Sequence, residues 1–263
     1  MNPLLSEYII RFQKDQTLKS IPTFFTQLDS QEYYKTLPYL FGIEVFCVRL
    51  LQALQQNHRI CIYSDYDTDA VTATATMLEG LTLLGFDKDR ISFYAPDRFT
   101  EGYGMNPEAI RELVKDFDLI ISVDCGINSV AEADAVIEAN QIAMSNSSST
   151  PQRVTHNCDL IITDHHHLQD QVPNALSVIN PRLAEFYNDN PEAFANQILK
   201  VIKSSSFEND LQSRITNWVN KVQRQPSEFP SNPELFLTSS ATGVGVAWFC
   251  LVWLSYFLIE VSL

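Results

Sequence analysis

The sequence predicts an α/β protein with a doubly wound, mainly parallel sheet and an N-terminal helical segment. From about residue 58 onward, short and continuously apolar runs alternate with segments of helical periodicity. Runs that are apolar on both faces are typical of parallel strands covered by helices on both sides. Hydrophobic residues make up 45% of the 263 residues, so a sizeable core is expected.

The predicted elements follow one another in a regular order. Residues 1–57 form a helical N-terminal segment, in which apolar residues recur at helical spacing over 4–12 and again over 42–56. Residues 58–182 form the α/β core, and 183–263 a helical connecting region. The core elements are strands 59–63, 91–95, 119–123 and 160–163 and helices 68–84, 107–115 and 130–139. Residues 144–158, which are polar and rich in serine, predict an insertion loop.

Charge and cysteine content exclude several classes of protein. The formal net charge of −14 argues against a basic protein that coats nucleic acid. A local groove lined by metal ions would still admit nucleic acid, because bound cations reverse the local field. The five cysteines are scattered and form no CxxC pair, which argues against a disulfide framework or a zinc ribbon. The N-terminus has early charges and no signal-peptide core, so a cytoplasmic protein is expected.

Each of the four predicted strands ends in a polar cluster. The clusters are Asp65, Asp67 and Asp69; Pro96, Asp97 and Arg98; Asp124, Cys125 and Gly126; and Asp164, His165, His166 and His167. Because the carboxyl ends of parallel strands share one edge of a sheet, these groups are expected to converge. The alternative for each cluster alone is a solvated acidic turn or a helix N-cap. Four clusters in register instead indicate a site for two divalent cations.

The residue types at this edge suit phosphate chemistry. Asp124 is suited to bridge two ions, and His165 or His166 would complete a shell compatible with Mn²⁺. Arg98 could neutralise phosphate charge. The loop 101–104 follows it, and its glycines suit a backbone with positive φ or one that approaches a phosphate closely.

Four ordered motifs resemble the DHH phosphoesterase family, which is named for the run found here at 164–166. Within this family the chain is most similar to the RecJ-type single-stranded-DNA-specific exonucleases. The motifs are SDYDTDA at 64–70, PDRFTEGYGM at 96–105, VDCGI at 123–127 and VINP at 178–181. In addition, GVGVAW at 243–248 resembles the GVAF helix of the family.

The resemblance implies a phosphodiesterase that depends on two Mn²⁺ or Mg²⁺ ions and removes nucleotides from the 5′ end of single-stranded DNA in repair and recombination. It implies that Asp67 and Asp69 each hold a metal, that Asp124 bridges the ions, that His165 is a ligand, and that Asp65 is a ligand or supports one. His166 would contact the phosphate or assist the leaving group. The implied substrate contacts are Arg98, Glu101, Gly102, Tyr103 and Gly104.

The chain also departs from the family pattern. Ser64 and Ala70 replace glycines, and Ala70 fits only with a negative φ. The family has a further metal-binding aspartate after the GVAF helix, and no such motif precedes Leu263. The two-ion site is therefore expected to be incomplete, in an N-terminal fragment or a truncated homologue. The alternative functions are a non-catalytic remnant and a phosphodiesterase of small oligonucleotides or cyclic dinucleotides.

Residues 244–263 carry one charge in twenty positions. A membrane anchor and a buried helix both fit this composition. The likeness to the GVAF helix favours the buried helix, and no membrane partner is expected. Missing C-terminal domains or a partner protein are expected to cover this apolar segment.

Overall fold

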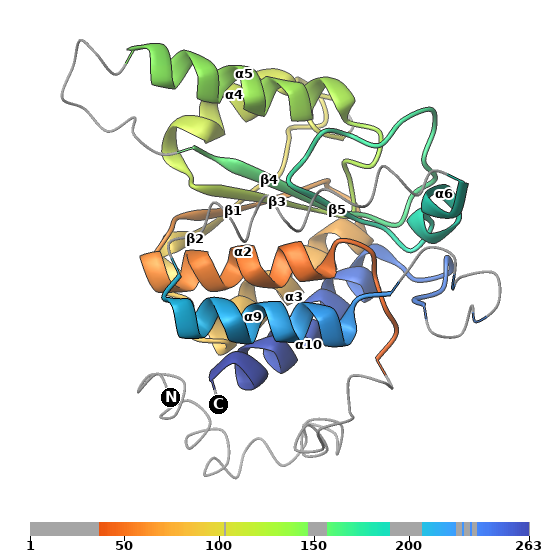
Figure 1. The fold of residues 1–263 in the computed structure, drawn as a ribbon. Coiled ribbons are helices and arrows are strands. Elements are labelled where there is room, and N and C mark those ends of the chain that lie inside the picture. Colours follow the sequence, from red (N-terminus) through yellow and green to blue (C-terminus); the bar gives the residue numbers. More distant parts are fainter. Residues whose placement is uncertain are drawn as a thin grey trace, which may run out of the picture.

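In a computed structural model, residues 37–102, 104–146, 157–189, 207–224, 228, 232 and 236–262 are described. These residues form a five-stranded sheet in which every pair of neighbouring strands is parallel, in the order β2-β1-β3-β4-β5 (Figure 1). The strands are β1 (Ile60–Ser64), β2 (Ile91–Tyr94), β3 (Leu119–Val123), β4 (Asp159–Thr163) and β5 (Ser177–Ile179). The predicted parallel α/β architecture is confirmed.

Helices cover both faces of this sheet (Figure 1). One face carries α4 (Pro107–Asp116) and α5 (Val130–Asn146). The opposite face carries α2 (Ile43–Gln56), α3 (Thr68–Leu83), α9 (Asn209–Val222) and α10 (Gly243–Ser262). Two short elements complete the described chain, η3 (Lys88–Arg90) and α6 (Leu183–Asp189). Strands β1, β3, β4 and β5 are almost wholly buried between two helical layers, which is why their sequences are mostly apolar, whereas the edge strand β2 is partly exposed.

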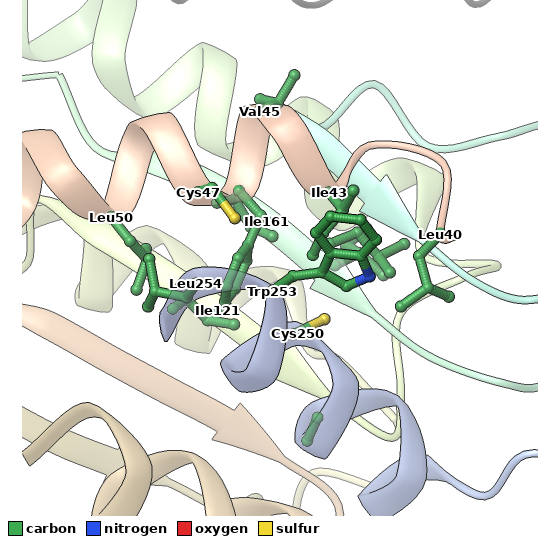
Figure 2. Close-up of a cluster of buried hydrophobic side chains, with 14 of the residues drawn as sticks. Leu40, Ile43, Val45, Cys47, Leu50, Ile121, Ile161, Cys250, Trp253 and Leu254 are labelled. Atoms are coloured by element: carbon green, nitrogen blue, oxygen red, sulfur yellow. The ribbon is translucent and has the colours of Figure 1, made fainter. Parts of the chain in front are cut away.

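Helix α10 packs against α2, α3 and the sheet within the hydrophobic core. Figure 2 shows Trp253 and Cys250 of α10 facing residues of α2, with Ile121 and Ile161 of the central strands beside them. The Trp253 Nε1 atom donates a 2.9 Å hydrogen bond to the carbonyl oxygen of Pro38, so the buried indole is satisfied. Residues from both ends of the described chain thus share one hydrophobic core with the sheet.

The apolar C-terminal segment is the buried helix α10. Among the described residues, α10 is the one helix that is long and apolar enough to cross a membrane. However, 67% of an apolar 18-residue stretch within it is buried inside the protein. Helices α2, α3 and α9 of the same chain already cover most of this segment, and the expectation that a missing domain or a partner covers it stays a proposal.

Other details differ from the prediction or lie outside the described residues. Strand β5 was not predicted, because three residues starting with a serine give no strand pattern. Helix α5 continues to Asn146, so the first residues of the predicted insertion loop are helical. Residues 147–156 of that loop and the predicted helix over 4–12 lie outside the described residues. The division at 57 and 182 stays a proposal.

Candidate metal centre

Three aspartates begin the loops after three adjacent strands. In the register of the sheet, Ser64 of β1 is paired with Val123 of β3, which is paired with Thr163 of β4. Asp65, Asp124 and Asp164 are the next residues in each chain segment. The parallel topology therefore brings together carboxylates that lie far apart in the sequence, as the strand-end argument predicted.

Asp124 is buried at the centre of this group. Its backbone adopts φ 59°, a left-handed conformation, and its amide donates to the Thr163 carbonyl. The residue is 2% exposed, and its Oδ1 atom accepts no hydrogen bond from the described residues. Burial, followed by the negative charges of Asp69 and Asp67, raises the pKa of Asp124 to about 7.

Asp65 presents a second buried carboxylate oxygen. Its Oδ1 atom accepts a 2.7 Å hydrogen bond from the Tyr66 amide, whereas Oδ2 has no partner among the described residues. Burial raises the pKa of this carboxyl. Two buried oxygens without donors, one each on Asp65 and Asp124, are costly unless a cation compensates for them. The donor set of carboxylates and imidazoles therefore fits a divalent ion such as Mn²⁺.

His165 lies against these acids. Its Nε2 atom is 3.1 Å from Asp124 Oδ1, without hydrogen-bond geometry, and 3.6 Å from Asp69 Oδ2. One ligand atom each from Asp124, His165 and His166 lies within 4.8 Å of the other two, a spacing that could hold one ion. The structure thus brings together three of the residues that the sequence singled out.

His166 is oriented by the first residue of its own motif. Asp164 Oδ1 lies 2.7 Å from His166 Nδ1, which leaves Nε2 for another partner. This hydrogen bond is the main reason why the pKa of His166 is raised. The Asp164 carboxylate also accepts from the amides of Ile127, His165 and His166. Residues that surround metal ligands often act in this way: a carboxylate fixes the tautomer and the orientation of a histidine ring.

The two remaining predicted metal ligands lie at helix N-termini. Asp67 is the N-cap of α3, and its Oδ1 atom accepts from the Ala70 amide at 2.9 Å. Ala70 is in the α3 helix and is not among the residues with positive φ, as the replacement of glycine required. Asp69 accepts from the amides of Gly243 and Val244, at the start of α10. Asp67 thus caps the N-terminus of α3 and also contributes negative charge to the group of acids around Asp124.

The loop after β2 lies beside the Asp65 loop. The guanidinium carbon of Arg98 lies over the rings of Tyr66 and Phe99, 5.3 and 5.9 Å from their centroids. The Phe99 side chain is 91% exposed. Tyr66 and Phe99 were not predicted as site residues, although exposed aromatic residues next to a phosphate site are the signal that could have found them.

The predicted substrate loop, 101–104, agrees with the prediction only in part. Glu101 accepts a 2.7 Å hydrogen bond from the Tyr94 hydroxyl, so its carboxylate fastens the loop to β2. Gly102 and Gly104 have φ of 86° and 82°, which confirms the expected left-handed backbone. Tyr103 lies outside the described residues.

Two residues that follow β5 donate hydrogen bonds to the backbone of the histidine loop. Asn180 Nδ2 donates to the His166 carbonyl, and Arg182 Nε donates to the His165 carbonyl. Asn180 belongs to the VINP motif, whereas nothing in the sequence pointed to Arg182. Together they fix the backbone of the loop that carries both histidines.

Comparison with known proteins matches this architecture to one family. The model of the "DHH family, N-terminal domain" matches residues 59–219. The single-stranded-DNA-specific exonuclease RecJ of Bacillus subtilis is 34% identical over 183 residues, which cover 69% of this chain and 20% of the relative. The RecJ of Thermus thermophilus is 32% identical over 152 residues and is also covered to 20%. The chain thus spans about a fifth of the length of these relatives.

A solved structure gives the same result. A crystal structure of exonuclease RecJ bound to manganese superposes with a TM-score of 0.51 at 26% identity. The match covers 84% of this chain and 39% of that one.

Proposed function

The chain belongs to the DHH family, and on that premise we propose that it is a metal-dependent phosphodiesterase that uses Mn²⁺ or Mg²⁺. The convergence of Asp124, His165 and His166 carries this proposal, because the buried Oδ1 of Asp124 has no hydrogen-bond partner among the described residues. A similar RecJ structure was solved with manganese, which agrees with the donor set found here.

The residues that would hold the ions are those predicted from the sequence. Asp65, Asp67, Asp69, Asp124 and His165 would supply the ligands, with Asp124 shared by both ions. When bound, such ions activate a water molecule and stabilise the charge that develops on the phosphate. His166 keeps Nδ1 on Asp164 and presents Nε2 to the phosphate or to the leaving oxygen. The hydrogen bond with Asp164 raises the pKa of His166, and a protonated ring at this position could donate to that oxygen.

We propose single-stranded DNA, attacked at its 5′ end, as the substrate, in the context of repair and recombination. The names of the relatives support single-stranded DNA as the substrate. The exposed rings of Tyr66 and Phe99, with Arg98 stacked on both, support it independently. Aromatic and guanidinium faces stack on bases of any sequence and suit a single strand.

A nuclease assay tests the proposal. The chain is expected to release nucleotides from 5′-labelled single strands only when Mn²⁺ or Mg²⁺ is present. Asp124→Ala should reduce the rate about a thousandfold or more, because several kcal/mol of electrostatic stabilisation depend on the bound ions. Asp89→Ala changes an exposed aspartate at the other end of the sheet and should behave like the wild type.

Other outcomes point to other functions. Metal-independent release, or release that Asp124→Ala leaves unchanged, would contradict a metal-dependent enzyme. Faster hydrolysis of a dinucleotide or a cyclic dinucleotide than of a long strand would contradict the DNA substrate and keep the phosphodiesterase.

Phe99→Ala is expected to weaken the binding of single-stranded DNA about fivefold or more, because stacking on one base is worth about 1–3 kcal/mol. Leu83→Ala removes another exposed apolar side chain, at the far end of α3, and serves as the control. The measurement is fluorescence anisotropy of a labelled single strand, together with Mn²⁺ affinity. A loss of Mn²⁺ binding in Phe99→Ala would show that the effect is not one of stacking.

A further inference from the structure

The N-terminus of α10 is fastened to one of the proposed metal ligands. The Gly243 amide donates a 2.7 Å hydrogen bond to Asp69 Oδ2, and the Val244 amide donates a 2.9 Å hydrogen bond to Asp69 Oδ1. Both amides belong to the first turn of the helix, where backbone donors have no partner within the helix. They hold the carboxylate of Asp69 in one orientation, and each oxygen keeps a second lone pair for another partner.

Gly243 also lies directly against Asp124. A Cβ atom at position 243 would lie 2.6 Å from the Cβ atom of Asp124 and closer still to its carboxylate. Real Cβ atoms do not approach so closely, so any side chain here would displace Asp124 or the start of α10. Gly245, in the same turn, has room, because a Cβ atom there would meet Thr242 and Ala241 at 3.6 and 3.8 Å.

We propose that the start of α10 positions the metal ligands and that Gly243 is the positioning residue that makes this contact possible. The inference rests on the proposed function, because it assumes a metal at Asp69, Asp124 and His165. The α10 amides fix Asp69 from one side, and the bare backbone of Gly243 lets Asp124 stay beside His165.

A coupling between metal binding and the docking of α10 follows from this arrangement. The helix packs on α2, α3 and α9 through a largely buried surface, so its position is set by the core. If a docked α10 favours metal binding, the bound metal must favour a docked α10 by the same free energy, because such linkage is reciprocal. The bound ion therefore stabilises the docked position of α10, although most residues of this helix lie far from the ion.

Mn²⁺ titrations of the wild type, Gly243→Ala and Gly245→Ala test the inference, with electron paramagnetic resonance reporting free Mn²⁺. Gly243→Ala is expected to weaken Mn²⁺ binding about tenfold or more, because the loss of one well-placed ligand or its support costs about that factor. Gly245→Ala should bind Mn²⁺ as the wild type does. Hydrogen exchange of the peptide covering 243–250 should slow on addition of Mn²⁺ in the wild type and change little in Gly243→Ala.

The possible failures are distinguishable. A wild type that binds no Mn²⁺ would overturn the proposed function and this inference together. A wild type that binds Mn²⁺, with Gly243→Ala binding equally well, would overturn the inference alone.

If Gly243→Ala does not fold, Val244→Pro tests the positioning role instead. It replaces the Val244 amide donor to Asp69 with a ring carbon, at a first-turn position of the helix where proline is tolerated. Weaker Mn²⁺ binding by this variant supports the positioning role, and unchanged binding overturns it.

Discussion

Asp164→Asn is expected to lower the free energy of unfolding by about 3 kcal/mol and to disorder the loop that carries both histidines. The buried carboxylate accepts three backbone amides and the Nδ1 atom of His166. Burial acts to raise the pKa of Asp164, but these hydrogen bonds outweigh burial and lower it, so the charged form is the one that the site stabilises. Hydrogen bonds to charged groups contribute about 1.5–3 kcal/mol each and are not additive.

An asparagine cannot replace this acceptor. Its single oxygen could keep the bonds made by Oδ1, but its amide nitrogen would then face the Ile127 amide, donor against donor. Urea unfolding followed by circular dichroism measures the loss of stability. Asp170→Asn, an exposed change in the same loop, is the matched control and should change stability by less than about 0.5 kcal/mol. A variant of Asp164 as stable as this control would show that the loop does not depend on the carboxylate.

The convergence of Asp65, Asp124 and Asp164 could be predicted because it depends on topology alone. Each follows a continuously apolar strand, and strands of that kind pair in parallel with their carboxyl ends at one edge. The bounds of helices α3 and α4 were also close to the prediction. Clear signals mark where they begin, an aspartate N-cap at Asp67 and an asparagine followed by proline at Asn106.

Contacts between side chains could not be predicted, because they depend on how distant segments pack. Asp69 and Gly243 are 174 positions apart, and no local pattern shows that one caps the helix of the other. Glu101 is expected from its motif to face the substrate, but it accepts a hydrogen bond from Tyr94 on the neighbouring strand. Composition also could not show that the apolar helix α10 is covered by the same chain, because the helices that cover it come from both ends of the sequence.

Glu44→Gln is expected to stabilise the protein at neutral pH by about 3 kcal/mol. Glu44 is fully buried in the first turn of α2, where Oε1 accepts a 2.6 Å hydrogen bond from the Tyr39 hydroxyl. Its Oε2 atom has no partner among the described residues. Burial raises the pKa of Glu44 from 4.5 to about 7, although the hydrogen bond from Tyr39 acts to lower it. A glutamine keeps the acceptor for Tyr39 and carries no charge.

The direction of the pH effect follows from the raised pKa of Glu44. As the pH rises above 4.5, the unfolded chain loses this proton first, while the folded chain keeps it until about pH 7. The free energy of unfolding of the wild type therefore falls across this window and is independent of this group above it. At about 1.36 kcal/mol per tenfold change in the protonation equilibrium, the total cost is about 3 kcal/mol.

The test compares Glu44→Gln with the wild type from pH 5.5, above the sequence pI of about 4.7, to pH 8. The stability difference should grow from about 1 to about 3 kcal/mol over this range. Among the described residues, Tyr39 and Cys47 are titratable groups whose pKa the charge of Glu44 affects, and burial raises the pKa of both, so they stay neutral throughout. Glu79→Gln, an exposed change on α3, should follow the wild type at every pH. A stability difference for Glu44→Gln that does not change with pH would contradict the raised pKa of Glu44.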